Sequence, residues 1–205
     1  MSSVKVDYTG HSLVPVKKLL KYRQIKILTK RLCIRPFLFT DYARCKLSER
    51  ERSSIQNKFD EPLFGRFLSS YESFKKKVLH DRERGKNRTH YILGIFERRS
   101  GQLVGQLDLY LFNDELKWTN LGYHIQNQFW GMGHAPEACR SLLKYAFKFL
   151  NIHRVEILML AENIASLHVA EKLDMVFEGT RTNFFPGERS GELHIFAMNA
   201  FDAKK

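Results

Sequence analysis

Two glycines, Gly131 and Gly133, stand one residue apart between a predicted strand and a predicted helix, and this turn constrains the fold most strongly. Apolar residues alternate with polar ones over about 117–126, which is typical of a half-buried strand. From Pro136 onward apolar residues recur with a helical period, and proline is favoured in the first turn of a helix. Glycine tolerates positive φ, and the helix begins with unpaired N–H groups. The sequence therefore predicts a turn that can hold an anion.

The periodicity elsewhere predicts further helices and strands around this unit. They lie at about 25–36 (strand), 40–48 and 70–85 (helices), 91–96 and 103–109 (a hairpin), 155–160 (strand), 163–173 (helix), and 175–183 and 192–199 (strands). A helix that connects two neighbouring strands makes them parallel, whereas a hairpin makes them antiparallel. We therefore expect an α/β fold (an α+β mixed sheet) with a central, mostly antiparallel sheet, one parallel strand pair and about four flanking helices.

The length and composition indicate one globular domain. The chain has 205 residues, of which 43% are hydrophobic and 27% charged. No stretch approaches the ~20 apolar residues of a membrane-spanning helix, and the first residues lack the apolar segment of a secretory signal. Cys33, Cys45 and Cys139 show no C-x-x-C spacing, which argues against a disulfide framework and a thiolate zinc site. We expect a cytoplasmic protein with no bound metal and no membrane contact.

The positive charge is concentrated near the N-terminus. The chain has a formal net charge of +12, and residues 1–35 hold nine basic side chains against the single acid Asp7. We interpret residues 1–24 as a basic N-terminal extension and residues 25–205 as a single domain. Such an extension could contact RNA or a ribosome. It could equally be a solvated arm.

Four interpretations of the glycine turn compete. A P-loop requires G-x-x-x-x-G-K-[ST], which this chain lacks, and a dinucleotide fingerprint requires a third glycine where Pro136 stands. A structural turn without a ligand is the third interpretation. The fourth is a cradle for the pyrophosphate of coenzyme A, in which backbone N–H groups face the phosphates.

The residues of the turn resemble the GNAT superfamily of N-acetyltransferases. Gln128-x-x-Gly131-x-Gly133-x-Ala135 is similar to the family's acetyl-CoA signature, [RQ]-x-x-G-x-[GA]. Further similar segments follow the family's order: Leu28–Arg35, Leu121–Ile125, Leu150–Val155, Asn163–Ser166 and Glu171–Leu173. The resemblance covers about residues 27–199 and is closest to the branch that acetylates ribosomal-protein alanine N-termini.

The resemblance implies a GNAT-like sheet whose parallel pair splays apart to admit the coenzyme. Backbone groups of Ile125 and Gln126 would pair with the pantetheine arm, and N–H groups of residues 130–135 would hold the pyrophosphate. The implied acetyl-CoA-binding residues are Ile125, Gln126, Trp130, Gly131, Met132, Gly133, His134, Ala135, Asn163 and Ser166. Acetyl-CoA would act as a co-substrate.

Two residues receive catalytic roles by resemblance. Ser166 would donate a proton to the leaving thiolate, and Asn163 would orient the turn beside the pantetheine. Alternatively, Ser166 is an ordinary helix serine that bonds its own backbone. The sequence departs from the family at Ala170, where many members place a tyrosine acid, and at Asp174, where a glycine is usual.

No single general base is marked. His124, Glu178 and Glu192 are candidates, since histidine titrates near neutral pH and a carboxylate can accept a proton, but a chain of water molecules would also serve.

The implied activity is transfer of an acetyl group to a primary amine. We expect the N-terminal α-amine of a protein, in particular a ribosomal protein, as the acceptor. The segments 49–65 and 184–191 would flank the acceptor groove with Phe59, Phe64 and Phe184. The alternatives are a polyamine or aminoglycoside acetyltransferase, and a non-catalytic coenzyme-sensing module that binds RNA or a ribosome.

Overall fold

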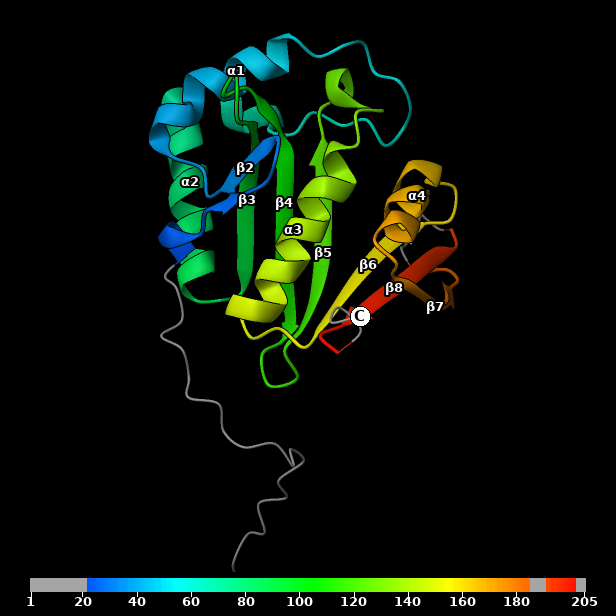
Figure 1. Ribbon diagram of the computed structural model, residues 1–205. Helices are drawn as coiled ribbons and strands as arrows, with labels where there is room; N and C mark the ends of the chain where they lie inside the picture. Colours follow the sequence, from blue (N-terminus) through cyan, green and yellow to red (C-terminus); the bar gives the residue numbers. More distant parts are fainter. Residues whose placement is uncertain (1–21, 185–190, 202–205) are drawn as a thin grey trace, which may run out of the picture.

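The computed structural model describes residues 22–184 and 191–201. In this part of the chain one sheet of eight strands has the order β1-β2-β3-β4-β5-β6-β8-β7 (Figure 1). The strands are β1 (Ile27–Leu28), β2 (Leu32–Arg35), β3 (His90–Glu97), β4 (Leu103–Asn113), β5 (Trp118–Ile125), β6 (Arg154–Leu160), β7 (Val176–Arg181) and β8 (Leu193–Asn199). The expected mixed, mostly antiparallel sheet is confirmed.

Four α-helices flank the sheet within the described residues. They are α1 (Tyr42–Arg50), α2 (Tyr71–Lys86), α3 (His134–Phe149) and α4 (Ile164–Lys172). Short 3₁₀ turns precede or connect them: η1 (Tyr22–Gln24), η2 (Phe39–Asp41), η3 (Gly65–Leu68) and η4 (Asn127–Phe129). No described helix is long and apolar enough to cross a membrane.

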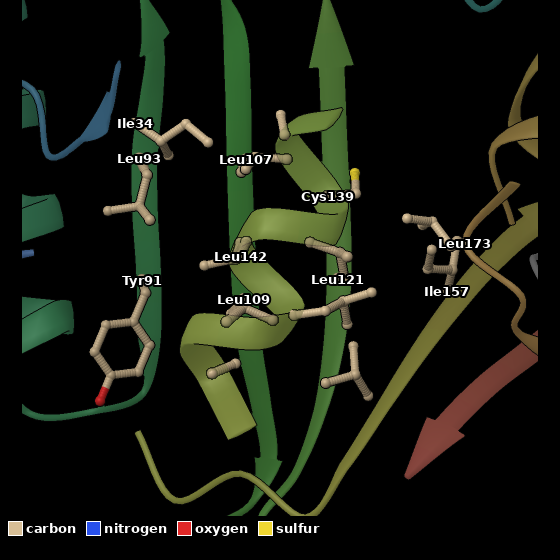
Figure 2. Close-up of a cluster of buried hydrophobic side chains, with 14 of the residues drawn as sticks. Ile34, Tyr91, Leu93, Leu107, Leu109, Leu121, Cys139, Leu142, Ile157 and Leu173 are labelled. Atoms are coloured by element: carbon tan, nitrogen blue, oxygen red, sulfur yellow. The ribbon is translucent and has the colours of Figure 1, made fainter. Parts of the chain in front are cut away.

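The helix α3 covers the central strands and forms the main core with them. Figure 2 shows Leu142 and Cys139 of α3 over Leu107, Leu109 and Leu121 of β4 and β5. These side chains meet because the helical stripe repeats about every 3.6 residues, whereas alternate strand residues share one face of the sheet. A second core lies on the other face of β3, where α1, α2 and η3 pack on Ile92 and Phe96.

The parallel pair β5–β6 is joined only at its beginning. Trp118, Thr119 and Asn120 of β5 pair with Arg154, Val155 and Glu156 of β6. Beyond Asn120 the two strands have no further register pairs, and the rest of β6 is paired only on its other edge, with β8. The predicted splay is therefore confirmed, and it leaves one edge of β5 open from Leu121 onward.

Two local predictions were wrong. The strand predicted at 25–36 is a hairpin of β1 and β2, in which Ile27 pairs with Ile34. Thr29 closes its turn, since its Oγ1 accepts from the N–H of Leu32 at 2.8 Å. Gly85 does not end the second helix. It lies inside α2. A glycine is needed there because the ring of Tyr22 occupies the space where a Cβ would stand.

The first described residues belong to the packed structure. Tyr22 is 5% exposed, and its phenol donates to the carbonyl of Ile92 at 2.5 Å. Residues 1–21, which hold most of the predicted basic extension, lie outside the described residues. The boundary at residue 24 therefore stays a prediction.

The three cysteines are free thiols. Cys45 and Cys139 are buried, and burial raises the pKa of both thiols.

Candidate active site

A cleft of about 310 Å³ opens where β5 and β6 separate. It is bounded by the end of β5, the glycine turn, the start of α3, the first turns of α4 and part of the loop before η3. The lining residues are Asn57, Phe59, Tyr123, His124, Ile125, Phe129, Trp130, Gly131, Gly133, His134, Ala135, Pro136, Asn163, Ala165, Ser166, His168, Val169 and Lys172. Eight of the ten predicted coenzyme-binding residues are brought together here; Gln126 and Met132 do not line the cleft.

The glycine turn adopts the backbone conformation that the sequence predicts. Gly131 has φ 76° and Gly133 has φ 73°, both in the left-handed region. Space does not impose these glycines, because a Cβ at Gly131 would meet nothing within 4 Å and one at Gly133 only the guanidinium of Arg31 at 3.6 Å. Within the described chain, no acceptor meets the N–H groups of residues 131–135. These N–H groups, at the positive end of α3, suit an anion.

Two backbone predictions need correction. The N–H of Gln126 donates to the carbonyl of Val104 at 2.9 Å, and its carbonyl accepts from the N–H of Phe129. The N–H of Trp130 is likewise used, since it donates to the carbonyl of Asn127 at 3.2 Å. Pairing with the strand β4 thus removes the N–H of Gln126, and a local turn removes that of Trp130, as backbone donors to a ligand.

Ile125 directs its N–H group toward the cleft, as its predicted role requires. Successive strand residues direct their N–H groups to opposite neighbours, so the bond from Gln126 to β4 turns the N–H of Ile125 toward the cleft. The carbonyl of Ile125 is occupied, because it accepts from the indole N–H of Trp130 at 2.7 Å. Trp130 therefore contributes its side chain to the cleft wall and supports the exposed edge of β5.

The carboxylate of Glu137, in the first turn of α3, fastens the glycine turn to the β1–β2 hairpin. Glu137 accepts from Thr29 Oγ1 at 2.6 Å and from Arg31 Nε at 2.6 Å. Arg31 also donates to the carbonyl of Met132 at 2.7 Å. Burial opposes the charge of Glu137, but the bonds from Thr29 and Arg31 outweigh it and lower the pKa of the carboxyl. Thr29 and Arg31 both lie in the family-like segment Leu28–Arg35, so this resemblance was the feature of the sequence that could have indicated the contact.

Asn163 and Ser166 lie together at the start of α4. The Oδ1 of Asn163 accepts from the N–H of Ser166 at 3.1 Å, which makes Asn163 the N-cap of the helix. Among the described residues Ser166 Oγ makes no hydrogen bond, whereas Ser141 Oγ bonds back to the carbonyl of Glu137 at 2.9 Å. Ser141 thus makes the bond to its own helix backbone that is typical of a helix serine, and Ser166 does not. The hydroxyl of Ser166 remains available in the cleft.

Comparison with protein families identifies the domain. Residues 31–176 match the model described as "Acetyltransferase (GNAT) domain", which covers more than half of the chain. The chain belongs to the GNAT acetyltransferase family. Its sequence relatives include proteins named as N-acetyltransferases.

Two GNAT relatives come from Bacillus subtilis strain 168. "Probable N-acetyltransferase YjcK" is 30% identical over 109 residues, which cover 53% of this chain and 60% of that protein. "Uncharacterized N-acetyltransferase YnaD" is 29% identical over 153 residues, which cover 75% of this chain and 84% of that protein. The match thus spans about three fifths of YjcK's own length.

Solved GNAT structures show the same fold. "RimL- Ribosomal L7/L12 alpha-N-protein acetyltransferase in complex with Coenzyme A" aligns with a TM-score of 0.72 at 20% identity, over 87% of this chain and 99% of that one. The ribosomal-protein-S5-alanine acetyltransferase of Vibrio fischeri aligns with a TM-score of 0.70 at 15% identity, over 89% and 100%. At these identities the likeness establishes the fold alone.

The loop after α1 forms the other wall of the GNAT cleft. Buried Asp60 accepts from Arg52 at 2.6 Å and from Asn127 Nδ2 at 2.8 Å, which ties the loop to η4. Burial disfavours the Asp60 charge, but bonds from Gln56 and Asn127, with the charge of Arg52, lower the pKa of its carboxyl. This anchoring places Phe59 in the cleft wall.

The aromatic residues predicted beside the acceptor groove separate into two groups. Phe59 lines the cleft, whereas Phe64 is 2% exposed and packs in the second core. Phe184 is exposed. Residues 185–190 of the second predicted segment lie outside the described residues.

The structure also separates the three candidate bases. His124 lines the cleft. Glu178 is not among the lining residues and forms an ion pair with Arg154, and Glu192 is not among them either. His134 does line the cleft, at the turn, where burial and the charge of Arg31 lower its pKa.

The two departures from the family pattern have clear structural outcomes. Ala170 is fully buried in the main core and presents no polar group. Asp174 adopts φ 59°, the left-handed conformation that the usual glycine would take. The N–H of Met175 bonds the carbonyl of Ala170, and that of Asp174 bonds the carbonyl of Glu171, so the helix still ends in a Schellman motif.

Metal ligation finds no support in residues 22–184 and 191–201, where no group of three or more His, Cys, Asp or Glu side chains is arranged to hold an ion.

Proposed function

We propose that this GNAT enzyme binds acetyl-CoA in the β5–β6 cleft and transfers the acetyl group to the N-terminal α-amine of a protein. The observation that carries the coenzyme assignment is the row of unoccupied N–H groups over residues 131–135 beside the opening between the two strands. The pyrophosphate fits these donors, since both the open N–H groups and the dipole of α3 favour negative charge. The N–H of Ile125 would pair with the pantetheine arm, as in strand addition.

A second hollow supports the same orientation of the coenzyme. It has a volume of about 370 Å³, lies beside Gly133 and is lined by three cations, Arg140, Lys144 and Lys172, and by one carboxylate, Glu137, which is paired with Arg31. Lys172 also lines the cleft, so the two spaces are adjacent. Coenzyme A carries a 3′-phosphate in addition to its pyrophosphate, and three cations suit a phosphate group. We assign this hollow to the 3′-phosphate.

The chain supplies groups for both ends of the reaction. An α-amine has a pKa of about 8, so most of it is protonated at neutral pH and a proton must leave before or during attack. At the other end, the unbonded hydroxyl of Ser166 can donate a proton to the thiolate that leaves the acetyl group. Asn163 acts on Ser166 as a positioning residue, because it holds the backbone of this turn.

The choice of a protein N-terminus as acceptor rests on the named relatives. Two structural neighbours are named for the acetylation of ribosomal proteins, RimL for L7/L12 at the α-amine and the Vibrio fischeri enzyme for S5 at alanine. Another neighbour is a spermidine N-acetyltransferase chimera, with a TM-score of 0.65 at 17% identity. Polyamines are therefore the competing acceptors.

The test combines coenzyme binding with a panel of acceptors. Isothermal titration with acetyl-CoA reports binding, and release of free thiol reports transfer to peptides that begin with Ala, Ser or Met, to spermidine and to an aminoglycoside. We expect thiol release with at least one peptide and a mass increase of one acetyl group on its α-amine. Release with spermidine or the aminoglycoside alone would refute the protein acceptor, and absence of acetyl-CoA binding would refute the cleft assignment.

A further inference from the structure

The cleft can be reached from both faces of the sheet. Strand side chains alternate between faces, and Tyr123 and Ile125 pack in the core that α3 and α4 share. The side chain of His124, between them, must therefore lie on the opposite face, yet it lines the same cleft as Ser166. This is possible because β6 no longer pairs with β5 at this level. A coenzyme on the α3 side and an acceptor on the other face would thus meet in the opening.

On the face of the sheet that carries His124, the loop after α1 forms the wall of the opening. Asn57 and Phe59, from the loop anchored by Asp60, line the cleft together with His124. The charged groups that act on the His124 ring all come from this loop, namely Arg52, Asp60 and Glu61. On β4 the residue paired with His124 is the uncharged Gln106.

The imidazole of His124 is poised as a neutral base. Its Nε2 is buried and has no hydrogen-bond partner among the described residues. Burial, followed by the charge of Arg52, lowers the pKa of the ring, while Asp60 and Glu61 oppose this shift. A ring with a lowered pKa is unprotonated at neutral pH and can take up a proton.

We propose that His124 is the catalytic base, which takes the proton from the acceptor amine as the amine attacks the thioester. The nitrogen lone pair forms the C–N bond at the acetyl carbon, and one N–H proton passes to the imidazole of His124. The C–S bond then breaks, and its electron pair leaves on the sulfur, which takes a proton through the hydroxyl of Ser166. Solvent returns a proton to Ser166 and removes the one that His124 took up, so both side chains end as they began. The products are an amide and a free thiol, and no other reactant is consumed.

The other titratable groups that line the cleft belong to the glycine turn, to α4 or to the core side of β5. His134 belongs to the glycine turn, and His168 and Lys172 lie on α4. The phenol of Tyr123 is committed to the carbonyl of Ser166. Among the described lining residues, His124 alone combines a side chain on the acceptor face with a ring that is neutral at neutral pH.

The test measures the pH dependence of turnover in the full-length chain. The acceptor is whichever amine of the panel the wild-type protein acetylates. We expect His124→Gln and His124→Ala to lower kcat by about 100-fold or more, with an unchanged acetyl-CoA Kd. Between about pH 5 and about pH 9, titration of the acceptor amine should make the wild type and every variant gain rate toward high pH. The wild type should show, in addition, an acidic limb below the ordinary histidine pKa of about 6.5, and this acidic limb should be absent in both variants. The exposed His80 on α2 provides the control His80→Gln, which should retain the wild-type profile.

Imidazole rescue separates catalysis from structure. Added imidazole should restore at least part of the rate of His124→Ala, which a merely structural role would not allow. A variant at His124 that keeps wild-type kcat, or an unchanged acidic limb in His124→Gln, would overturn the proposal.

This inference rests on acetyl transfer to an amine, and not on which amine is used. Activity with spermidine alone would refute the protein acceptor but leave the His124 measurements in force. NMR titration of the His124 ring in the free protein adds a readout without turnover. A measured pKa above about 7.5 would overturn the base assignment even if no acceptor were found, since the ring would then be charged at neutral pH.

Discussion

The phenol of Tyr123 donates a hydrogen bond to the backbone carbonyl of Ser166 over 3.3 Å, and thereby joins β5 to the first turn of α4 across the cleft. The two strands that flank the cleft do not pair at this level, so this contact helps to set the width of the opening. Tyr123 was noted in the sequence only as part of a strand motif. The structure shows that it holds the segment that carries Ser166.

Tyr123→Phe should therefore loosen α4 against β5. The variant keeps the ring in the core but loses one partly buried hydrogen bond, which costs about 1 kcal/mol in the free energy of unfolding. We expect kcat to fall several-fold as Ser166 becomes less well placed. Denaturant unfolding and thiol-release kinetics measure the two effects. Tyr110→Phe, an exposed tyrosine on β4, is the control and should change neither.

Gly133→Ala tests the glycine turn. Forcing alanine to φ 73° costs about 1–2 kcal/mol, so we expect the turn to change conformation and acetyl-CoA affinity to fall at least about tenfold. Gly65→Ala is a matched control, because Gly65 also has positive φ and open space around its Cβ but lies at η3. It should lose comparable stability and keep its affinity in isothermal titration. Equal loss of affinity in both variants would show that the effect is general destabilisation.

Ser166→Ala tests the proton donor to the thiolate. We expect kcat to fall by about tenfold or more, with little change in acetyl-CoA Kd, because the hydroxyl would act mainly in the transition state. Ser73→Ala on α2 removes a helical serine outside the cleft and serves as control. If Ser166→Ala kept the wild-type kcat, a water molecule and not Ser166 would protonate the thiolate.

The basic hollow predicts discrimination between coenzyme A and dephospho-coenzyme A. Lys144→Gln should weaken binding of coenzyme A several-fold and leave the weaker binding of dephospho-coenzyme A unchanged, since only the former presents a 3′-phosphate to this side chain. Lys148→Gln, one helical turn further along α3 and outside the lining of the hollow, should bind both forms like the wild type. Equal weakening of both ligands by Lys144→Gln would place the phosphate elsewhere.

Asp174→Gly should stabilise the protein. Asp174 pays the cost of the left-handed conformation at φ 59°, which glycine avoids, and the gain should be about 1 kcal/mol in the free energy of unfolding. The lost ion pair with Arg140, 4.0 Å long and exposed, contributes little. Chemical denaturation at neutral pH measures the change. A lower stability of Asp174→Gly would mean that the aspartate side chain contributes more than this geometry indicates.

Much of the architecture could be predicted from local sequence patterns. The stripe that includes Ala138, Leu142 and Ala146 specifies one buried face of α3, and the alternation in β5 specifies its two faces. The positive φ of Gly131 and Gly133 follows from residue type in a strand–turn–helix setting. Such features depend on residues close together in the chain, so short-range periodicity contains them.

Contacts between distant segments could not be predicted in this way. The clasp of Glu137 with Arg31 joins residues 106 positions apart. The backbone direction of Gln126 depends on its pairing with Val104, and the separation of Phe59 from Phe64 depends on how one loop packs. The local sequence pattern does not show whether the N–H of Gln126 is already bonded, or which of Phe59 and Phe64 lines the cleft.

By itself, the sequence determined the glycine turn, the family and the order of helices and strands except for the β1–β2 hairpin. Only the tertiary structure decided that His124 and Ser166 share one cleft from opposite faces of the sheet, while Glu178 is paired elsewhere. The physical reason is that periodicity depends on neighbouring residues, whereas a site depends on strand register and on where pairing stops. Here the pairing of β5 with β6 stops after Asn120, and the chemistry gathers in that opening.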